Sequence, residues 1–288
     1  MEQKTTAVAS GIENNDKEAL GSQENKNREK IIINKQFLLE SGAHFGHRTK
    51  DWHPKTLKYL YGTHNQIHII NLFETLKAWP KVRKLIVNSV ATGMDILFVG
   101  TKRQASEIIK REAEYCGQPY VDKKWKGGTL TNLKTMRKRI DYLSKLDKIL
   151  NNPEKSKRYV KKELLNMQKQ RDKLEYMLGG IKNMNCYPGL VFVVDTRKER
   201  TAVLEAKKLG IPVISLLDSN CNPEDADFFI PANDDAIKTL GLFIGAVADA
   251  VIEGKQLAAQ RQQTGEEMDT SQLLYGVEDT DNKQPIVE

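Results

Sequence analysis

The chain has few cysteines, and it lacks the short motifs that mark common metal and nucleotide sites. Its three cysteines, Cys116, Cys186 and Cys221, lie far apart and form no CxxC pair. This spacing argues against a disulfide framework and against a zinc site built from neighbouring residues, and it suits a reducing compartment. Neither GxGxxG nor GxxxxGK(S/T) occurs, so the usual glycine-rich phosphate-binding loops are missing. We therefore predict no metal and no cofactor.

The sequence also lacks a long apolar run. The longest one, residues 240–248, is too short to cross a bilayer and is followed by Asp249, so we expect a buried helix there. Residues 1–30 contain no apolar segment of the secretory type and include six acidic residues, which organellar transit peptides avoid. These observations predict a cytoplasmic protein without a membrane segment.

Positive charge is concentrated in the middle of the chain. The net charge of the 288 residues is +7, but residues 1–30 carry −1 and residues 257–288 carry −5. Residues 31–256 therefore carry +13. Lys and Arg that merely solvate surface helices explain part of this excess, but not its clustering. A core this basic indicates a polyanionic partner.

Short apolar runs alternate with helical patterns in two stretches of the sequence. Strands are expected at residues 95–100, 189–195, 211–218 and 226–231. Helices are expected from Asn71 towards Thr92, at residues 103–116 and 199–209, and at 234–253 with Gly254 as the C-cap. Continuous apolar strands separated by helices predict an open α/β fold of Rossmann or flavodoxin-like type, with a parallel sheet covered by helices on both faces.

Residues 133–178 show no strand pattern. Their apolar residues recur at helical spacing, and Pro153 is suited to the start of a second helix. Residues 134–178 contain fourteen Lys and Arg against six Asp and Glu. The pattern predicts a basic antiparallel coiled-coil hairpin inserted into the α/β domain, with Val160, Leu164, Met167, Leu174 and Leu178 on the seam of its second helix. The predicted organisation is a disordered polar extension (1–30), an α/β domain (31–132 and 179–256), the hairpin (133–178) and a disordered acidic tail (257–288).

The carboxyl ends of the expected strands carry polar residues. Thr101, Lys102, Asp195 and Asp218 would converge there, as magnesium and phosphate ligands do in phosphoacceptor domains. The other interpretation is that the two aspartates cap the turns and helices that follow, as Asp often does. We favour capping, because a fold alone does not imply catalysis. A phosphate-processing enzyme remains the alternative.

Two basic segments suit RNA. In GAHFGHRTKDWHPKTLK, cations alternate with aromatic rings, a pattern typical of phosphate contacts and base stacking, whereas its histidines fit no zinc signature. The other interpretation is an ordinary turn with Trp52 buried. In KWKGGTLTNLKTMRKRI, a glycine turn opens a helix whose first turns carry Arg137, Lys138 and Arg139. Helix N-terminal amides attract anions, and so many cations suit a backbone of many phosphates.

Several blocks occur in a fixed order and identify a resemblance. LLESGAHFGHRTKDWHPK, HIINLFETL, ILFVGTKRQASE, KWKGGTLTNLKT, LGGIKNM, the run from PGLVFVVDTRKER to FFIPANDDAI, and LFIGAVADAVIEG lie within residues 33–255. Together they resemble the family of bacterial small-subunit ribosomal protein number two. The resemblance implies a flavodoxin-like domain with a coiled-coil hairpin, no catalysis and binding to small-subunit rRNA. It further implies a position near the mRNA path upstream of the start codon, beside neighbouring ribosomal proteins that include the large multi-OB-fold mRNA-binding protein.

The blocks and the two basic segments together supply a set of candidate rRNA contacts. A third option, a coiled-coil adaptor that binds only proteins, would not need these cations. The candidates are His44, His47, Arg48, Lys50, Trp52, Lys55, Lys58, Lys102, Arg103, Trp125, Lys126, Gly127, Gly128, Thr131, Asn132, Arg137, Lys138 and Arg139.

Overall fold

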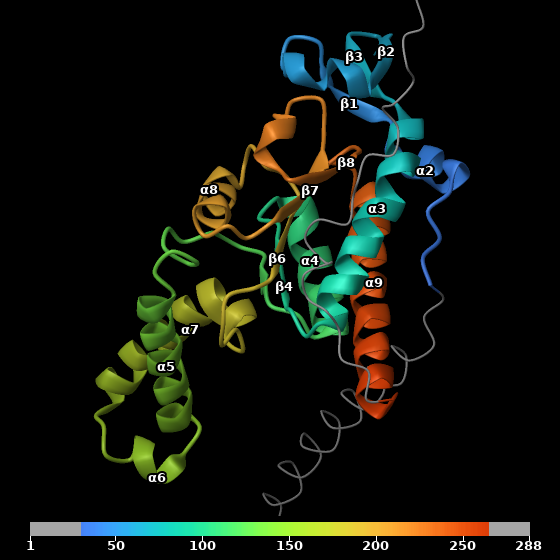
Figure 1. The fold of residues 1–288 in the computed structure, drawn as a ribbon. Coiled ribbons are helices and arrows are strands. Elements are labelled where there is room, and N and C mark those ends of the chain that lie inside the picture. The colour runs from blue at the N-terminus through green and yellow to red at the C-terminus, as the bar shows by residue number, and fades with distance from the viewer. Residues whose placement is uncertain (1–29, 265–288) are drawn as a thin grey trace, which may run out of the picture. The chain divides into compact units, whose positions relative to one another are not determined.

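A computed structural model describes residues 30–264, and residues 33–264 belong to one unit (Figure 1). The predicted disorder of residues 1–29 and of residues 265–288 concerns positions outside the described residues. Residues 257–264, which were assigned to the acidic tail, are instead helical.

A five-stranded sheet forms the centre of this unit. Its order is β5-β4-β6-β7-β8, and every neighbouring pair is parallel. Strands β4, β6 and β7 are buried along their whole length, which explains why all of their residues except Ser215 are apolar. The α/β prediction is confirmed. The strands are β4 (Ile96–Val99), β5 (Tyr120–Val121), β6 (Leu190–Val193), β7 (Val213–Leu217) and β8 (Phe228–Pro231).

Helices cover both faces of the sheet (Figure 1). On one face, α3 (Leu72–Ala91) and α4 (Arg103–Cys116) both pack against α9 (Ile237–Thr264). On the other face, α8 (Arg200–Lys208) and the beginning of α5 (Leu133–Leu150) join a core with alternate residues of the strands. That core includes Leu97 and Val99 of β4, Val191 and Val193 of β6, Val213 of β7, and Met136 and Ile140 of α5.

The predicted caps of α3 and α9 had different outcomes. Asn71 caps α3 by accepting a hydrogen bond from the Phe73 amide, and α3 continues through Pro80 without a break. Gly254 does not end α9, which runs on to Thr264. A Cβ at Gly254 would lie 2.7 Å from Val90 Cβ and 2.8 Å from the Val87 carbonyl oxygen. Gly254 therefore lets α9 approach α3 closely, and the prediction of a cap was wrong.

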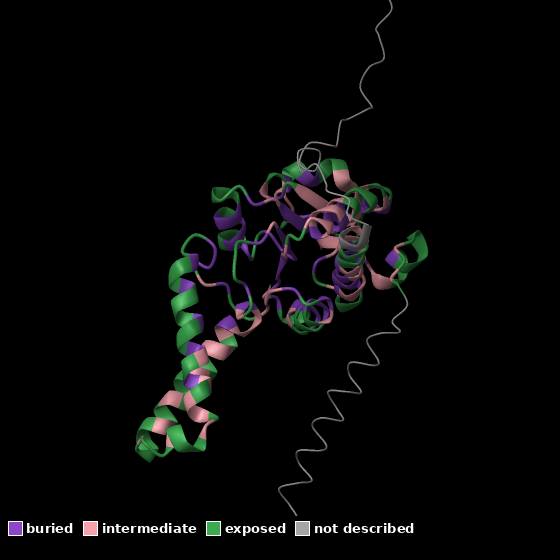
Figure 2. Cartoon of the chain, turned by 60° about the horizontal axis from the view of Figure 1, so that its bottom comes forward, coloured by how far each residue is buried: buried purple, intermediate pink, exposed green. Residues whose placement is uncertain are grey.

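The basic segment forms α5, the short α6 (Pro153–Ser156), α7 (Lys161–Leu178) and the 3-10 turn η3 (Gly179–Ile181). Helices α5 and α7 pack along each other, and the Tyr142 hydroxyl donates to Gln170 at 2.8 Å. Most residues of this segment are exposed (Figure 2). Pro153 begins α6 rather than the second long helix, and Val160 is 68% exposed instead of lying on a seam.

A small antiparallel sheet precedes α3 and was not predicted. Its order is β1-β3-β2, and residues Asn65 and Gln66, both with positive φ, form the turn between β2 and β3. Four of the five residues of β2 are exposed, so this strand lacks the alternation that marks a half-buried strand. The elements are α2 (Lys35–Ser41), β1 (Phe45–Arg48), the 3-10 helix η2 (Pro54–Tyr59), β2 (Leu60–His64) and β3 (Ile67–Ile70); η4 (Pro223–Asp225) lies later, between β7 and β8.

Candidate nucleic-acid interface

The carboxyl ends of the central strands converge on the Lys102 ammonium. Its Nζ lies 2.9 Å from Asp195 Oδ2, 2.7 Å from Asp234 Oδ1 and 2.8 Å from Asp235 Oδ1. Lys102 is only 8% exposed. Burial by itself lowers the pKa of Lys102, but the charges of Asp234 and Asp195 outweigh it and raise that pKa. Lys102 is thus a buried cation paired within the chain.

His47 closes the same cluster from the small sheet. Its Nδ1 lies 3.0 Å from Asp218 Oδ1 and its Nε2 lies 3.2 Å from Asp235 Oδ2. The hydrogen bonds to Asp218 and Asp235 raise the pKa of His47 to about 10, although burial opposes the shift. His47 is therefore protonated near neutral pH, and both ring nitrogens are engaged by carboxylates of the chain.

Asp195 also caps the loop that follows its strand, whereas Asp218 accepts from Ser219, directly after β7, and from the loop after β8. Asp195 Oδ1 accepts from the amides of Arg197 at 2.8 Å and Lys198 at 3.1 Å, and Asp218 Oδ2 accepts from the Asp234 amide at 3.2 Å. Both interpretations of these aspartates therefore apply, because Asp195 and Asp218 belong to one cluster of charged groups and also accept hydrogen bonds from backbone amides. Burial raises the pKa of Asp234, and the neighbouring Asp218 adds to the shift.

Two sets of donor atoms in this cluster are close enough to hold a metal ion. They are His47 with Asp234 and Asp235, and Asp195 with Cys221 and Asp234, each set lying within 4.8 Å. Lys102 already supplies a positive charge to three of these carboxylates. The arrangement is that of an internal ion-pair cluster, to which Asp234 and Asp235 belong although the sequence did not single them out.

The first basic segment presents some of its candidates to solvent. Arg48, Lys50 and Lys58 are exposed, and Lys58 Nζ lies 5.0 Å from the centroid of the Tyr59 ring. Lys55 pairs with Glu224. Trp52 is half-buried, with its ring 5.1 Å from that of His68. His44 is also half-buried, and burial lowers its pKa.

The loop WKGGTLT encloses an anion that belongs to the chain itself. The carboxylate of Glu205, on α8, accepts hydrogen bonds from Trp125 Nε1 at 3.1 Å and from the Gly128 amide at 2.8 Å. It also accepts from the Leu130 amide at 3.0 Å and from the Thr131 amide and hydroxyl, both at 3.1 Å. Trp125 is 9% exposed, so stacking on a base would require its indole to leave this pocket. The Glu205 carboxylate therefore occupies the position in which these amides would otherwise hold a phosphate.

The remaining candidates lie around that loop and along α5. Arg103, Gly127, Asn132, Lys138 and Arg139 are exposed, and Lys126 is half-buried. Arg137 is exposed and donates to Asn185 Oδ1 at 2.5 Å. Sequence reasoning missed Tyr61, which is 80% exposed on β2 next to the first basic segment, because an isolated aromatic residue carries no positional signal.

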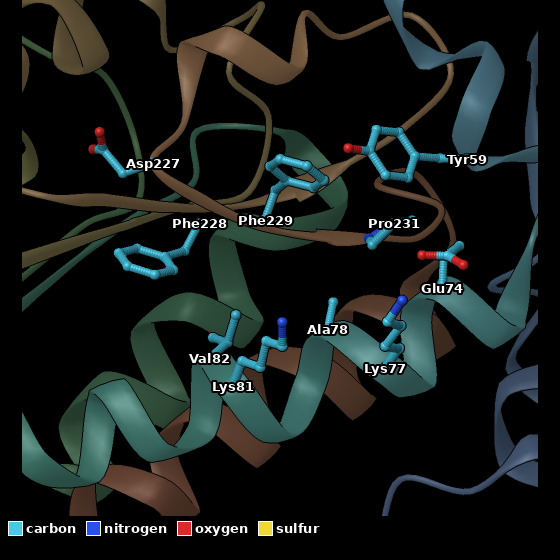
Figure 3. Close-up of a pocket in the computed structure, with 10 residues that line it drawn as sticks. All are labelled: Tyr59, Glu74, Lys77, Ala78, Lys81, Val82, Asp227, Phe228, Phe229 and Pro231. Carbon is cyan, nitrogen blue, oxygen red and sulfur yellow. The ribbon is translucent and has the colours of Figure 1, made fainter. Parts of the chain in front are cut away.

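A separate groove of about 300 Å³ lies between α3 and β8 (Figure 3). Lys77, Ala78 and Lys81 of α3 face β8 across it, and the Phe229 ring points away from α3 toward Tyr59. None of the predicted site residues lines this groove. Among residues 30–264, no helix combines the length and apolarity that crossing a bilayer requires.

Comparison with known proteins gives a consistent answer. The family model described as ribosomal protein S2 matches residues 38–254. The small ribosomal subunit protein uS2 of Lawsonia intracellularis is 46% identical over 236 residues, covering 82% of this chain and 81% of its own length. The protein of the same name from Geotalea uraniireducens is 47% identical over 230 residues, covering 80% of this chain and 90% of its own length. The one from Bartonella quintana is 49% identical over 217 residues, covering 75% of this chain and 84% of its own length. A match of this extent and identity shows that the chain belongs to the ribosomal protein S2 family.

Proposed function

We propose that this chain is a structural constituent of the small ribosomal subunit that holds rRNA through exposed cations on two separate segments of the fold. Family membership makes the chain a structural ribosomal protein rather than an enzyme, located with the ribosome in the cytoplasm. The finer claim, direct contact with rRNA, rests on the distribution of charge and exposure.

The observation that carries the proposal is the contrast between cations paired within the chain and cations exposed to solvent. Lys102 and His47, at the sheet end where α/β folds bind ligands, are paired with carboxylates of the chain. The cations near the small sheet and along α5 instead face solvent. A polyanion spread over a surface needs the second arrangement, since each phosphate is met by its own cation. The proposed contacts are the exposed Arg48, Lys50, Lys58, Arg137, Lys138 and Arg139, with Tyr61 and Asn132 beside them, and also Arg103 at the start of α4 and the half-buried Lys126.

The other predicted contacts have a supporting role in this proposal. Trp125, Gly128 and Thr131 donate to Glu205, and Lys55 pairs with Glu224. His44 and Trp52 flank the exposed cations of the small sheet and are half-buried, so they contribute through the shape of that segment. Gly127 is exposed and leaves room for a close approach of the RNA backbone.

The resemblance extends the proposal to a location. We place the chain near the mRNA path upstream of the start codon, where it supports docking of the large multi-OB-fold mRNA-binding ribosomal protein. The proposal for this partner stands apart from the rRNA contacts, because it does not depend on the α5 cations.

Incorporation into subunits tests the proposal. The triple variant Arg137→Glu, Lys138→Glu and Arg139→Glu reverses exposed charge on α5, and a matched control reverses Lys77, Lys81 and Lys84 on α3. Cell lysates are sedimented on sucrose gradients, and every fraction is probed for the tagged chain. We expect the native chain and the α3 control to migrate with small subunits, and the α5 variant to stay near the top.

Two outcomes would contradict the proposal. Co-migration of the α5 variant at native stoichiometry would favour a protein-only adaptor. Sedimentation of the native chain as free protein, at both low and moderate salt, would remove the ribosomal placement itself.

A further inference from the structure

We infer that Glu205 is the positioning residue of the WKGGTLT loop, an internal carboxylate that replaces a bound phosphate and holds the loop in the shape that presents its cations to rRNA. The inference rests on the proposed function for its consequence, but its structural part stands on the hydrogen bonds around one side chain.

Three local hydrogen bonds hold the loop, two of them from the Thr129 amide to the Lys126 carbonyl at 3.0 Å and from the Asn132 amide to the Gly128 carbonyl at 2.9 Å. The Thr129 hydroxyl donates to the Lys126 carbonyl at 2.6 Å, and Gly128 adopts a left-handed conformation with φ of 87°. A larger set of donors in the turn is held by a residue outside it. Five of its donors, from Trp125, Gly128, Leu130 and Thr131, meet at the two oxygens of Glu205. One side chain from a different helix therefore orders the turn.

Charge makes this arrangement specific for an ionised carboxylate. Glu205 is 7% exposed. Burial by itself would raise its pKa, but hydrogen bonds from the Thr131 amide, the Trp125 indole and the Gly128 and Leu130 amides lower it below its usual value. A carboxylate that accepts several backbone N–H bonds favours its charged form. A neutral polar side chain of the same size, such as Gln, would place at least one of its own hydrogen-bond donors against the donors of the loop.

The position of the charge also decides where RNA can bind. The amides that an incoming phosphate would seek are occupied by Glu205, whose negative charge repels a second anion. Phosphates are therefore left with the outer surface of the loop and the α5 cations. Glu205 thus fixes the loop and excludes phosphate from its interior at the same time.

Chemical rescue provides the test. Glu205→Ala removes the carboxylate and leaves a space lined by the same donors, which formate can enter. We expect this variant to melt at a lower temperature and to bind small-subunit rRNA about tenfold more weakly, a change of about 1.4 kcal/mol. Formate should restore part of the lost melting temperature and part of the lost rRNA affinity. Chloride at equal ionic strength should restore neither, since salt alone weakens RNA binding.

Two control variants separate positioning from general instability. Glu205→Gln fills the space with a neutral amide, so formate should restore neither its melting temperature nor its affinity. Val247→Ala, in the buried part of α9, lowers stability without touching the loop and should keep native affinity at temperatures where it is folded.

Each remaining outcome is decisive. Native affinity of folded Glu205→Ala would overturn the positioning role. So would a loss of affinity that formate leaves unchanged while it restores the melting temperature. If the native chain itself fails to bind rRNA, the proposed function falls, and formate rescue of the melting temperature alone still tests the internal carboxylate.

Discussion

The salt dependence of rRNA binding is the sharpest quantitative consequence of the exposed cations on α5. Consider the neutral triple variant Arg137→Gln, Lys138→Gln and Arg139→Gln, which removes three charges from side chains that face solvent. Each cation that neutralises a phosphate contributes about 0.7 to 0.9 to the slope of log K against log salt. Losing three contacts should therefore make that slope shallower by about 2.1 to 2.7.

The change is large enough to measure without extrapolation. Between about 50 and 200 mM salt, the native chain should lose about 20- to 40-fold more affinity than the variant, because three contacts each respond to a fourfold change in salt. Filter binding to purified small-subunit rRNA at four salt concentrations gives both slopes. Glutamine keeps the helical propensity of α5 close to that of Lys and Arg, so the fold is preserved.

The matched control decides whether location matters. Lys77→Gln, Lys81→Gln and Lys84→Gln remove the same charge from α3, where these side chains are also exposed. We expect this control to keep the native slope of log K against log salt. Equal shallowing in both variants would mean that net charge alone attracts RNA, and an unchanged slope in the α5 variant would remove these residues from the interface.

Three further predictions concern stability. Gly254→Ala should destabilise the fold by about 1–3 kcal/mol, because its Cβ would meet α3. Gly241→Ala is the matched control: its added Cβ meets no neighbouring atom within 4 Å, so it should stabilise the fold by about 0.5–1 kcal/mol. Urea unfolding measures both free energies. Gly128→Ala should cost about 1–2 kcal/mol because of its φ of 87°, and Gly127→Ala, which meets no neighbour, should cost less by the same assay. The pKa of His47 is raised from 6.5 to about 10, so the stabilisation that its charge provides should be complete below pH 6.5 and be lost as pH rises to about 10. The urea unfolding midpoints of the native chain and of His47→Gln should therefore converge between these pH values. Parallel curves of midpoint against pH would contradict this.

The sequence predicted the central sheet well because its strands are buried on both sides. Residues of β4 and β6 are all apolar, β7 is apolar except for Ser215, and Asn71 marks the beginning of α3, the helix that precedes β4. Strand β5 has only two residues, too few for any pattern. Gly254 was misread because a glycine that permits close helix packing and a glycine that ends a helix look alike in one sequence.

Of the candidate interface, only the cations at the surface could be predicted from the sequence. Runs of cations such as residues 137–139 are visible locally, and they do lie at the surface. Whether a cation is already paired is not visible locally, since Lys102 meets Asp234 and His47 meets Asp218 through the fold. Glu205 had no local signal at all, because its partners lie 74 to 80 residues earlier in the chain.

The attachment of α5 to the sheet constrains how this protein can vary in length. Met136 and Ile140 belong to the same core as the strands, whereas Leu143 and Leu146, one to two turns later, are buried outside that core. A peptide excised at residue 133 would therefore leave part of its apolar surface without a partner, so the helical pair is not a transplantable module. Beyond Leu146, insertions or deletions of matched turns in α5 and α7 leave the sheet untouched. Over evolutionary time, the tip can change its reach while residues 133–140 must change together with the strands they cover.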